Sequence, residues 1–202
     1  MIAVVDYGGG NVGSLLAALQ RRGAGVTFTA DPAVVRAAPA AILPGDGAFG
    51  ATMRALCERG LDDALRDVIA RERPFLGICV GMQLLYERST EFGGAGGFGV
   101  VAGAVDRFER APRVPHMGWN RLEPVAQHPF VEGLGDDEFV YFLHSYRAPV
   151  GPSTVAAATH GERFTAILAR GNVMGTQFHP EKSQSAGGRL LDNFIRLAKG
   201  RS

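Results

Sequence analysis

A short strand that runs straight into a helix through a glycine-flanked cysteine is the feature that most constrains this chain. The apolar run at 75–78 is typical of a buried strand, and from Val80 the apolar residues change to helical spacing, which predicts a helix that continues to Tyr86. Cys79 stands between the two elements in the pattern Gly77-Ile-Cys-Val-Gly81. Small neighbours permit a sharp turn, so the pattern predicts a nucleophile elbow with the thiol above the end of a sheet.

Two roles fit Cys79. At the positive end of a helix dipole the thiolate is favoured over the thiol, as a nucleophile requires. A cysteine at such a junction can equally be a small buried hydrophobic residue, because free cysteine is among the most buried residue types. The other cysteine, Cys57, shares a helical face with Met53 and Leu56 and is expected to fill the core. Two unmatched thiols indicate a reducing compartment, so a cytoplasmic location is expected.

The bulk properties describe an ordinary globular protein. The 202 residues are expected to form a single domain (1–202), with 46% hydrophobic and 20% charged residues. A formal net charge of +1 gives no electrostatic basis for binding nucleic acid or an anionic membrane. The apolar start at 1–5 has no basic leader and meets Asp6 at once, so it is interpreted as a first strand rather than a signal peptide or a membrane span.

The order of predicted elements indicates an α/β fold. The first half alternates strands with helices, whereas the second half is mostly strands that end in one long helix. Strands are predicted at 2–5, 26–29, 40–43, 75–78, 100–108, 121–125, 138–143, 154–159, 165–170 and 172–178; helices are predicted at 12–22, 32–36, 48–59, 61–73 and 188–199, and a flexible connector at 91–99. This order predicts a mostly parallel central sheet flanked by helices, with additional antiparallel strands from the second half.

A dinucleotide-binding signal competes with the cysteine. Gly8, Gly10 and Gly13 satisfy G-x-G-x-x-G, and Asp31 follows the second strand, about where a ribose-binding acid would lie. Each part also has a structural explanation. Many α/β proteins need a tight glycine turn into a helix, and Asp31 followed by Pro32 is a typical helix start.

A base for the cysteine is available in Phe178-His-Pro-Glu181. A cysteine nucleophile needs a base, and the base needs a group that fixes its tautomer. His179 and Glu181 are two apart, so their side chains project to the same side of an extended segment, and Pro180 disfavours helix there. The histidines and cysteines show no H-x-H, H-x-x-x-H or C-x-x-C spacing, so no metal site is expected.

The two motifs together resemble the class I, triad-type glutamine amidotransferases. The resemblance implies that Cys79 attacks the side-chain amide of glutamine, that His179 protonates the departing ammonia, and that Glu181 holds His179. Water would then release the thioester as glutamate, with no cofactor. It also implies that the oxyanion is met by the amide of Val80 and by the loop at 44–47, whose glycines leave backbone amides unobstructed; that loop supplies Gly45, Asp46 and Gly47.

Two positions need comment against the family pattern. Gln83 matches a position that contacts the substrate glutamine in the family, although a long polar residue on a helix is ordinarily solvated. Asp46 stands where an apolar residue is common, and its carboxylate would oppose an oxyanion if it faced inward. Only its backbone amide is needed, so its side chain is predicted to point away from Cys79.

Three further motifs resemble one branch of this family, the glutaminase subunits of imidazole glycerol phosphate synthases: Asp6-Tyr-Gly-Gly-Gly-Asn11, Pro115-His-Met-Gly-Trp-Asn120 and Tyr141-Phe-Leu-His-Ser-Tyr146. This resemblance implies a heterodimer with a separate β/α-barrel cyclase, which receives the ammonia and forms imidazole glycerol phosphate and aminoimidazole carboxamide ribotide in histidine biosynthesis.

The same resemblance assigns roles to the residues of these motifs. His144, Ser145 and Tyr146 would help to hold glutamine. The partner surface would contain Asn11, Pro115, His116, Met117, Trp119 and Asn120. A lone tryptophan is otherwise more often a core residue than an interface anchor. An amidotransferase subunit that supplies ammonia to a different synthase, such as the anthranilate enzyme, is a closer alternative than a dinucleotide-binding protein.

Overall fold

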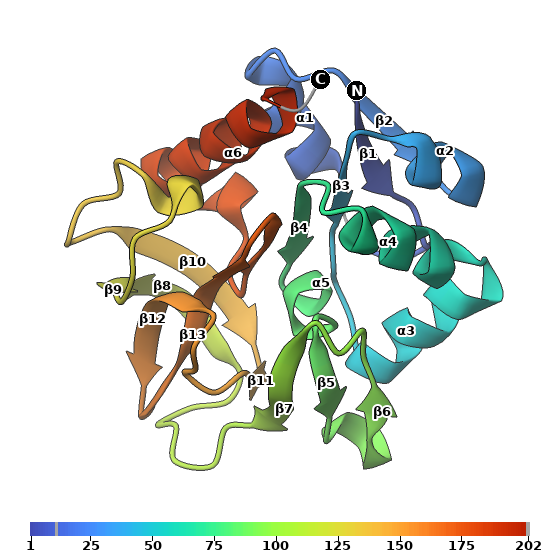
Figure 1. Cartoon of the computed structure of the whole chain (residues 1–202). Coiled ribbons are helices and arrows are strands. Elements are labelled where there is room, and N and C mark those ends of the chain that lie inside the picture. The colour runs from blue at the N-terminus through green and yellow to red at the C-terminus, as the bar shows by residue number, and fades with distance from the viewer. Residues whose placement is uncertain (11, 201–202) are drawn as a thin grey trace.

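An eight-stranded sheet forms the centre of the computed structural model, which describes residues 1–10 and 12–200 (Figure 1). Its strands, in spatial order, are β2 (Val26–Thr29), β1 (Ile2–Val5), β3 (Ala40–Leu43), β4 (Phe75–Ile78), β14 (Val173–Thr176), β13 (Glu162–Arg170), β12 (Thr154–His160) and β9 (Glu123–Pro124). The first five are parallel, and the last three continue the sheet in antiparallel pairs. The predicted fold class is confirmed.

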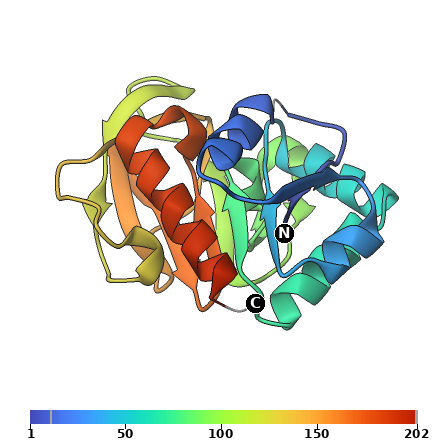
Figure 2. The ribbon, with the colours of Figure 1, turned by 90° about the horizontal axis from the view of Figure 1, so that it is seen from above.

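Helices cover both faces of the parallel part. One face packs on α1 (Gly13–Arg21) and α6 (Gln184–Lys199), which lie side by side in Figure 2. The other packs on α2 (Pro32–Ala37), α3 (Phe49–Glu58) and α4 (Leu61–Ala70). Every residue of β1, β3, β4 and β14 is therefore buried, which explains why these strands are continuous apolar runs rather than alternating ones.

Two smaller sheets lie beyond the carboxyl end of β4 (Figure 1). The first pairs β8 (His116–Arg121) with β10 (Phe139–His144). The second contains β11 (Tyr146–Arg147), β7 (Val101–Arg107), β5 (Tyr86–Ser89) and β6 (Ala95–Gly96). The short helices are α5 (Val80–Gln83) and the 3-10 turns η1 (Glu91–Gly93), η2 (Pro129–Val131) and η3 (Pro180–Lys182). Within the described residues no helix is both long and apolar enough to cross a membrane.

Several predicted boundaries were wrong. The helix after Cys79 ends at Gln83, and Tyr86 opens a strand, because the carbonyls of Leu84 and Leu85 accept hydrogen bonds from the backbone at 98 and 101. The predicted connector at 91–99 contains η1 and β6. Strand β8 was missed, and α6 begins at Gln184 rather than at 188. Cys57 is exposed, with its thiol 3.4 Å from Asp62 Oδ2, and does not fill the core.

Glycine is required where the elbow meets the loop after β3. A Cβ placed on Gly81 would lie 2.1 Å from the carbonyl oxygen of Leu43, and a Cβ on Gly77 would lie 2.4 Å from the carbonyl oxygen of Gly81. Both neighbours are backbone atoms, which cannot turn aside as a side chain can. The two glycines thus allow β4, α5 and the end of β3 to approach within van der Waals contact.

We expect Gly81→Ala to lower the free energy of unfolding by about 1–3 kcal/mol, the usual cost of overpacking, although alanine normally favours a helix. Urea denaturation measures the change. Gly96→Ala is the matched control, because a Cβ there has no neighbour within 4 Å. Equal midpoints for the two variants would show that the close approach is not needed.

Candidate active site

The site lies where the carboxyl ends of three adjacent parallel strands meet. The loop at 44–47 follows β3, Cys79 follows β4, and the segment at 177–181 follows β14, with β4 between the other two strands. Residues separated by 98 positions become neighbours because β4 pairs with β14 in register, Ile78 opposite Thr176. Ligands of open parallel sheets bind at such strand ends.

Cys79 adopts a backbone conformation that few side chains tolerate. Its φ and ψ are 54° and −111°, which for a non-glycine residue costs on the order of 1–3 kcal/mol. Its amide donates to Thr176 O at 2.7 Å, and its carbonyl accepts from Met82 and Gln83. The side chain is 7% exposed. These contacts hold the thiol above the end of β4, as the predicted elbow requires.

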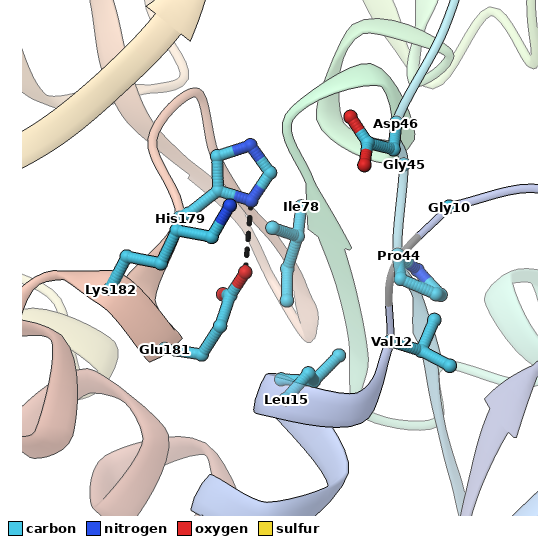
Figure 3. A pocket seen from close by; sticks show the side chains of 10 residues that line it. All are labelled: Gly10, Val12, Leu15, Pro44, Gly45, Asp46, Ile78, His179, Glu181 and Lys182. Carbon is cyan, nitrogen blue, oxygen red and sulfur yellow. Dashed lines mark hydrogen bonds and ion pairs between the residues drawn. The ribbon is translucent and has the colours of Figure 1, made fainter.

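His179 is fixed from three directions. Its amide donates to Tyr141 O at 3.2 Å, and its carbonyl accepts from Ser183 Oγ at 2.7 Å. In Figure 3 its ring faces Glu181, and Nδ1 donates to Glu181 Oε1 at 2.9 Å. Since Nδ1 is used in this way, Nε2 is the nitrogen left to face the Cys79 thiol, which is near enough to raise the pKa of the imidazole. The structure thus brings His179 into contact with Glu181 and places Cys79 nearby.

The surroundings of His179 favour its charged form. Burial lowers the pKa of the imidazole, but hydrogen bonds and charges from Cys79 and Glu181 outweigh it and raise the pKa to about 10. Within the described residues, the second oxygen of Glu181, Oε2, is buried without a hydrogen-bond partner. The negative charge of the Glu181 carboxylate is thus balanced mainly by His179. The pair can hold a proton that is available to a leaving group.

Two elements complete the wall around the sulfur. Leu143 O lies 3.9 Å and Gln177 Nε2 lies 3.8 Å from Cys79 Sγ. Gln83 is buried rather than solvated, and its Nε2 donates to Tyr146 O at 3.0 Å and to Gln177 Oε1 at 3.1 Å. Of the predicted glutamine-binding residues, Gln83 is thus buried against Tyr146 and Gln177, while Ser145 and Tyr146 are half-buried at the turn from β10 to β11.

The predicted oxyanion loop packs tightly on the elbow. A Cβ on Gly45 would lie 2.5 Å from the amide nitrogen of Gly81, so the loop touches the start of α5, where Val80 is buried. Gly47 has a φ of 138°. The amide of Asp46 donates to the hydroxyl of Tyr7 at 3.1 Å. In this conformation the Asp46 N–H is committed to Tyr7.

A pocket opens between this loop and the histidine (Figure 3). Asp46 is exposed, and in Figure 3 its carboxylate lies on the side of the loop that faces His179. That this side chain points away from Cys79 stays a prediction. The pocket is lined by Gly10, Val12, Leu15, Pro44, Gly45, Asp46, Ile78, His179, Glu181 and Lys182. The pocket therefore borders the imidazole of His179 and the carboxylate of Glu181.

An apolar face lies on the outer side of the sheet formed by β8 and β10. It consists of Met117, Trp119, Phe139, Tyr141 and Leu143, of which Met117 is 65%, Trp119 47% and Phe139 53% exposed. Trp119 is opposite Tyr141, with ring centroids 6.0 Å apart. The three residues of β10 were missed by the sequence analysis, because 139–143 is a continuous apolar run in the sequence and the alternation of outer and inner residues appears only in the fold.

The other predicted interface residues have different environments. Pro115 is exposed, Asn120 is half-buried and His116 is buried. Asn11 lies outside the described residues. His144 is buried as well, and both of its ring nitrogens are bonded within the protein, to Tyr146 O and to His116. A direct contact of its side chain with glutamine would have to replace one of these bonds.

The residues of the alternative signal are used by the fold. Asp31 Oδ1 accepts from the amide of Ala33 at 2.8 Å and caps α2, as the structural explanation predicted. Gly8 lies against the guanidinium of Arg59, which a Cβ would meet at 2.6 Å. Among the residues that the structure describes, no group of three histidine, cysteine or acidic side chains could hold a metal ion.

Comparison with known sequences decides the family. The family described as glutamine amidotransferase class-I matches residues 3–197. The chain belongs to this family. Its similarity to imidazole glycerol phosphate synthase subunit HisH extends over the whole chain: 44% identity to the protein of Salinibacter ruber, covering 98% of this chain and 94% of that one, and 45% to that of Herpetosiphon aurantiacus, covering 100% and 96%. The HisH 1 protein of Methanococcus maripaludis is 40% identical and is covered completely.

Solved structures of amidotransferases share the fold. A glutamine amidotransferase crystal structure superimposes with a TM-score of 0.76 at 23% identity, over 98% of this chain and 100% of that one. The glutaminase domain of Trypanosoma brucei CTPS with bound acivicin gives 0.72 at 13% identity, over 100% and 94%. These two structures therefore share the fold of the chain at low sequence identity.

We expect Glu181→Gln to lower the pKa of His179 from about 10, because the carboxylate favours the imidazolium through its charge and its hydrogen bond. An NMR titration of the labelled imidazole measures the midpoint. Because a neutral amide keeps the size of the side chain, the change in the pKa of His179 reports the loss of the carboxylate charge. Glu123→Gln, at an exposed ion pair remote from the site, is the control. An unchanged His179 midpoint in the Glu181 variant would contradict this account of the triad.

Proposed function

We propose that the protein is the glutaminase subunit of imidazole glycerol phosphate synthase. It hydrolyses L-glutamine to glutamate and ammonia and delivers the ammonia to a β/α-barrel cyclase subunit, within one amidotransferase domain (1–202) that acts in the cytoplasm. The observation that carries the proposal is the bond of His179 to Glu181 close to Cys79, in a chain that is similar over its whole length to HisH subunits.

The chemistry follows from the three side chains. The Cys79 thiolate attacks the side-chain amide carbon of glutamine and forms a C–S bond. The imidazolium of His179 gives its proton to the amide nitrogen, so ammonia leaves as the C–N bond breaks. A water molecule then gives a proton to His179 and attacks the thioester, and the C–S bond breaks to release glutamate. Glu181 fixes the tautomer of His179 in both steps, through the bond to Nδ1.

The oxyanion of each tetrahedral intermediate needs backbone donors. Val80 follows Cys79 at the start of α5, so its amide is one donor, while the loop at 44–47 supplies the other. The amide of Asp46 would have to leave Tyr7 before it could serve. Gly45 and Gly47 flank this peptide and permit such a rotation, because glycine occupies both signs of φ. Losing one such donor costs about 3–4 kcal/mol in the transition state.

The apolar face suits the cyclase partner. Exposed aromatic and methionine side chains on a regular sheet are typical of a binding surface, and Trp119 and Tyr141 are residue types that anchor interfaces. The same strand reaches the active site from its other edge: Tyr141 O accepts the amide of His179, and Leu143 O lies beside the sulfur. Docking on β10 would therefore act on groups that touch the triad.

The decisive experiment measures glutamine hydrolysis by the purified chain with and without the barrel cyclase and its nucleotide ligand. We expect the pair to hydrolyse glutamine much faster than the chain alone, Cys79→Ala to show no activity, and Trp119→Ala to weaken cyclase binding by about 2 kcal/mol or more while keeping the fold. Val125→Ala, an exposed apolar residue outside the apolar face, is the control for Trp119. A rate of glutamine hydrolysis that is the same with and without the cyclase would refute the subunit assignment. Co-purification with a different synthase would assign the chain to that synthase instead.

A second expectation concerns the bond between Asp46 and Tyr7. We expect Tyr7→Phe to raise the rate of glutamine hydrolysis by the chain without its partner about 2- to 10-fold. The substitution removes the hydrogen bond that holds the Asp46 amide on Tyr7, which contributes roughly 0.5–1.5 kcal/mol net. The rate of the assembled pair should change little. Tyr86→Phe, another buried tyrosine, is the control. A lower partner-free rate in the Tyr7 variant would mean that Tyr7 supports the active loop instead.

A further inference from the structure

Two histidines that the proposed reaction does not use form a buried chain of hydrogen bonds beside the active site. His116 Nδ1 lies 3.0 Å from His144 Nε2. At the outer end Asn120 Nδ2 lies 3.2 Å from His116 Nε2, and at the inner end His144 Nδ1 lies 2.8 Å from Tyr146 O. The chain therefore runs from strand β8, which carries the apolar face, to the turn beside Cys79.

The direction of every bond in this chain is determined at both ends. Tyr146 O can only accept, so His144 carries its proton on Nδ1 and offers Nε2 as an acceptor. His116 must then donate from Nδ1 and accept at Nε2. Asn120 supplies that donor, and its amide orientation is fixed because Nδ2 also donates to Thr159 O and Oδ1 accepts the amide of Arg121. With these tautomers, every ring nitrogen of His116 and His144 has a hydrogen-bond partner.

The inner end of the chain touches the groups around the sulfur. Tyr146 O accepts from His144 and also from Gln83 Nε2, and Gln83 bonds Gln177, whose own Nε2 lies 3.8 Å from Cys79 Sγ. His144 thus closes the turn that contains Ser145 and supports the polar side chains that line the wall. A buried network in which each member has its partners is rigid, because no member can turn without leaving another unpaired.

We propose that His116 and His144 are positioning residues, which hold the turn at 144–146 and Gln83 in the geometry that binds glutamine; the inference rests on the proposed function. Aromatic packing seals the pair from solvent. The ring of His116 is stacked between Phe142 and His160, with centroids 4.7 and 4.1 Å away, and Phe108 lies 5.2 Å from His144. Burial lowers the pKa of His116 to about 4 and that of His144 to about 3, so both rings stay neutral and keep their tautomers near neutral pH.

The experiment compares three variants of the full chain assembled with the cyclase. His116→Phe keeps the aromatic packing but breaks the chain, so KM for glutamine should rise about 2- to 10-fold, with kcat nearly unchanged. His116→Gln offers both a donor and an acceptor, and KM should return toward the wild-type value. His160→Phe is the matched control, since His160 stacks on the same ring but bonds Arg113 O outside the chain. We expect its KM to stay at the wild-type value.

The outcomes separate the two proposals. A wild-type pair that does not hydrolyse glutamine would refute the proposed function. An active wild type with unchanged KM in His116→Phe would overturn this inference alone, and so would equal defects in His116→Phe and His116→Gln, which would indicate a structural role.

A spectroscopic test does not depend on the variants folding. Nitrogen-15 NMR of labelled histidines in the wild-type chain should find both His116 and His144 protonated at Nδ1 and not at Nε2, with a coupling across the bond between His116 Nδ1 and His144 Nε2. A proton on Nε2 of either ring would break the chain as described and would overturn the inference.

Discussion

The site depends on one backbone conformation, that of Cys79. A positive φ at a cysteine is unfavourable, and it persists because the residue is held on both sides: its amide bonds β14, its carbonyl bonds the first turn of α5, and Gly81 presses against the end of β3. The strain of about 1–3 kcal/mol is small beside the burial of β4, which is covered by helices on both faces. Relaxing the turn would carry the sulfur away from His179, and the fold prevents this without any contact from the substrate.

Local patterns made it possible to predict the turn at Cys79 and the pairing of His179 with Glu181. The apolar runs of β1, β3 and β4, the glycines around Cys79 and the two-residue spacing of His179 and Glu181 each report a short-range constraint. The pairing of His116 with His144 could not be predicted in this way, because the two residues meet only through the register of β8 with β10, and β8 itself lacks a clear strand pattern. The bond from Asp46 to Tyr7 joins two loops 39 positions apart and has no sequence signal either.

Strand β10 joins the outside of the molecule to the triad because its side chains alternate. Phe139, Tyr141 and Leu143 point to the apolar face, whereas Phe142 and His144 pack inward. The backbone carbonyl oxygens of Tyr141 and Leu143, by contrast, contact His179 and Cys79. Atoms that contact Cys79 and His179 therefore belong to the same strand as the exposed side chains of the apolar face. A partner that docked on this face, as proposed, would bind one strand away from the sulfur and the imidazole.

The proposed chemistry requires a charged imidazole at His179 and a neutral one at His144. His144 lies close enough to His179 for their charges to repel, and two imidazolium groups would compete for the stabilisation that Cys79 and Glu181 provide. The protein separates them by environment. Carboxylate and thiol raise the pKa of His179 to about 10, while full burial among phenylalanines lowers that of His144 to about 3. The tautomer fixed by Tyr146 O then makes the neutral ring of His144 a structural group and leaves the proton on His179, where the proposed reaction would use it.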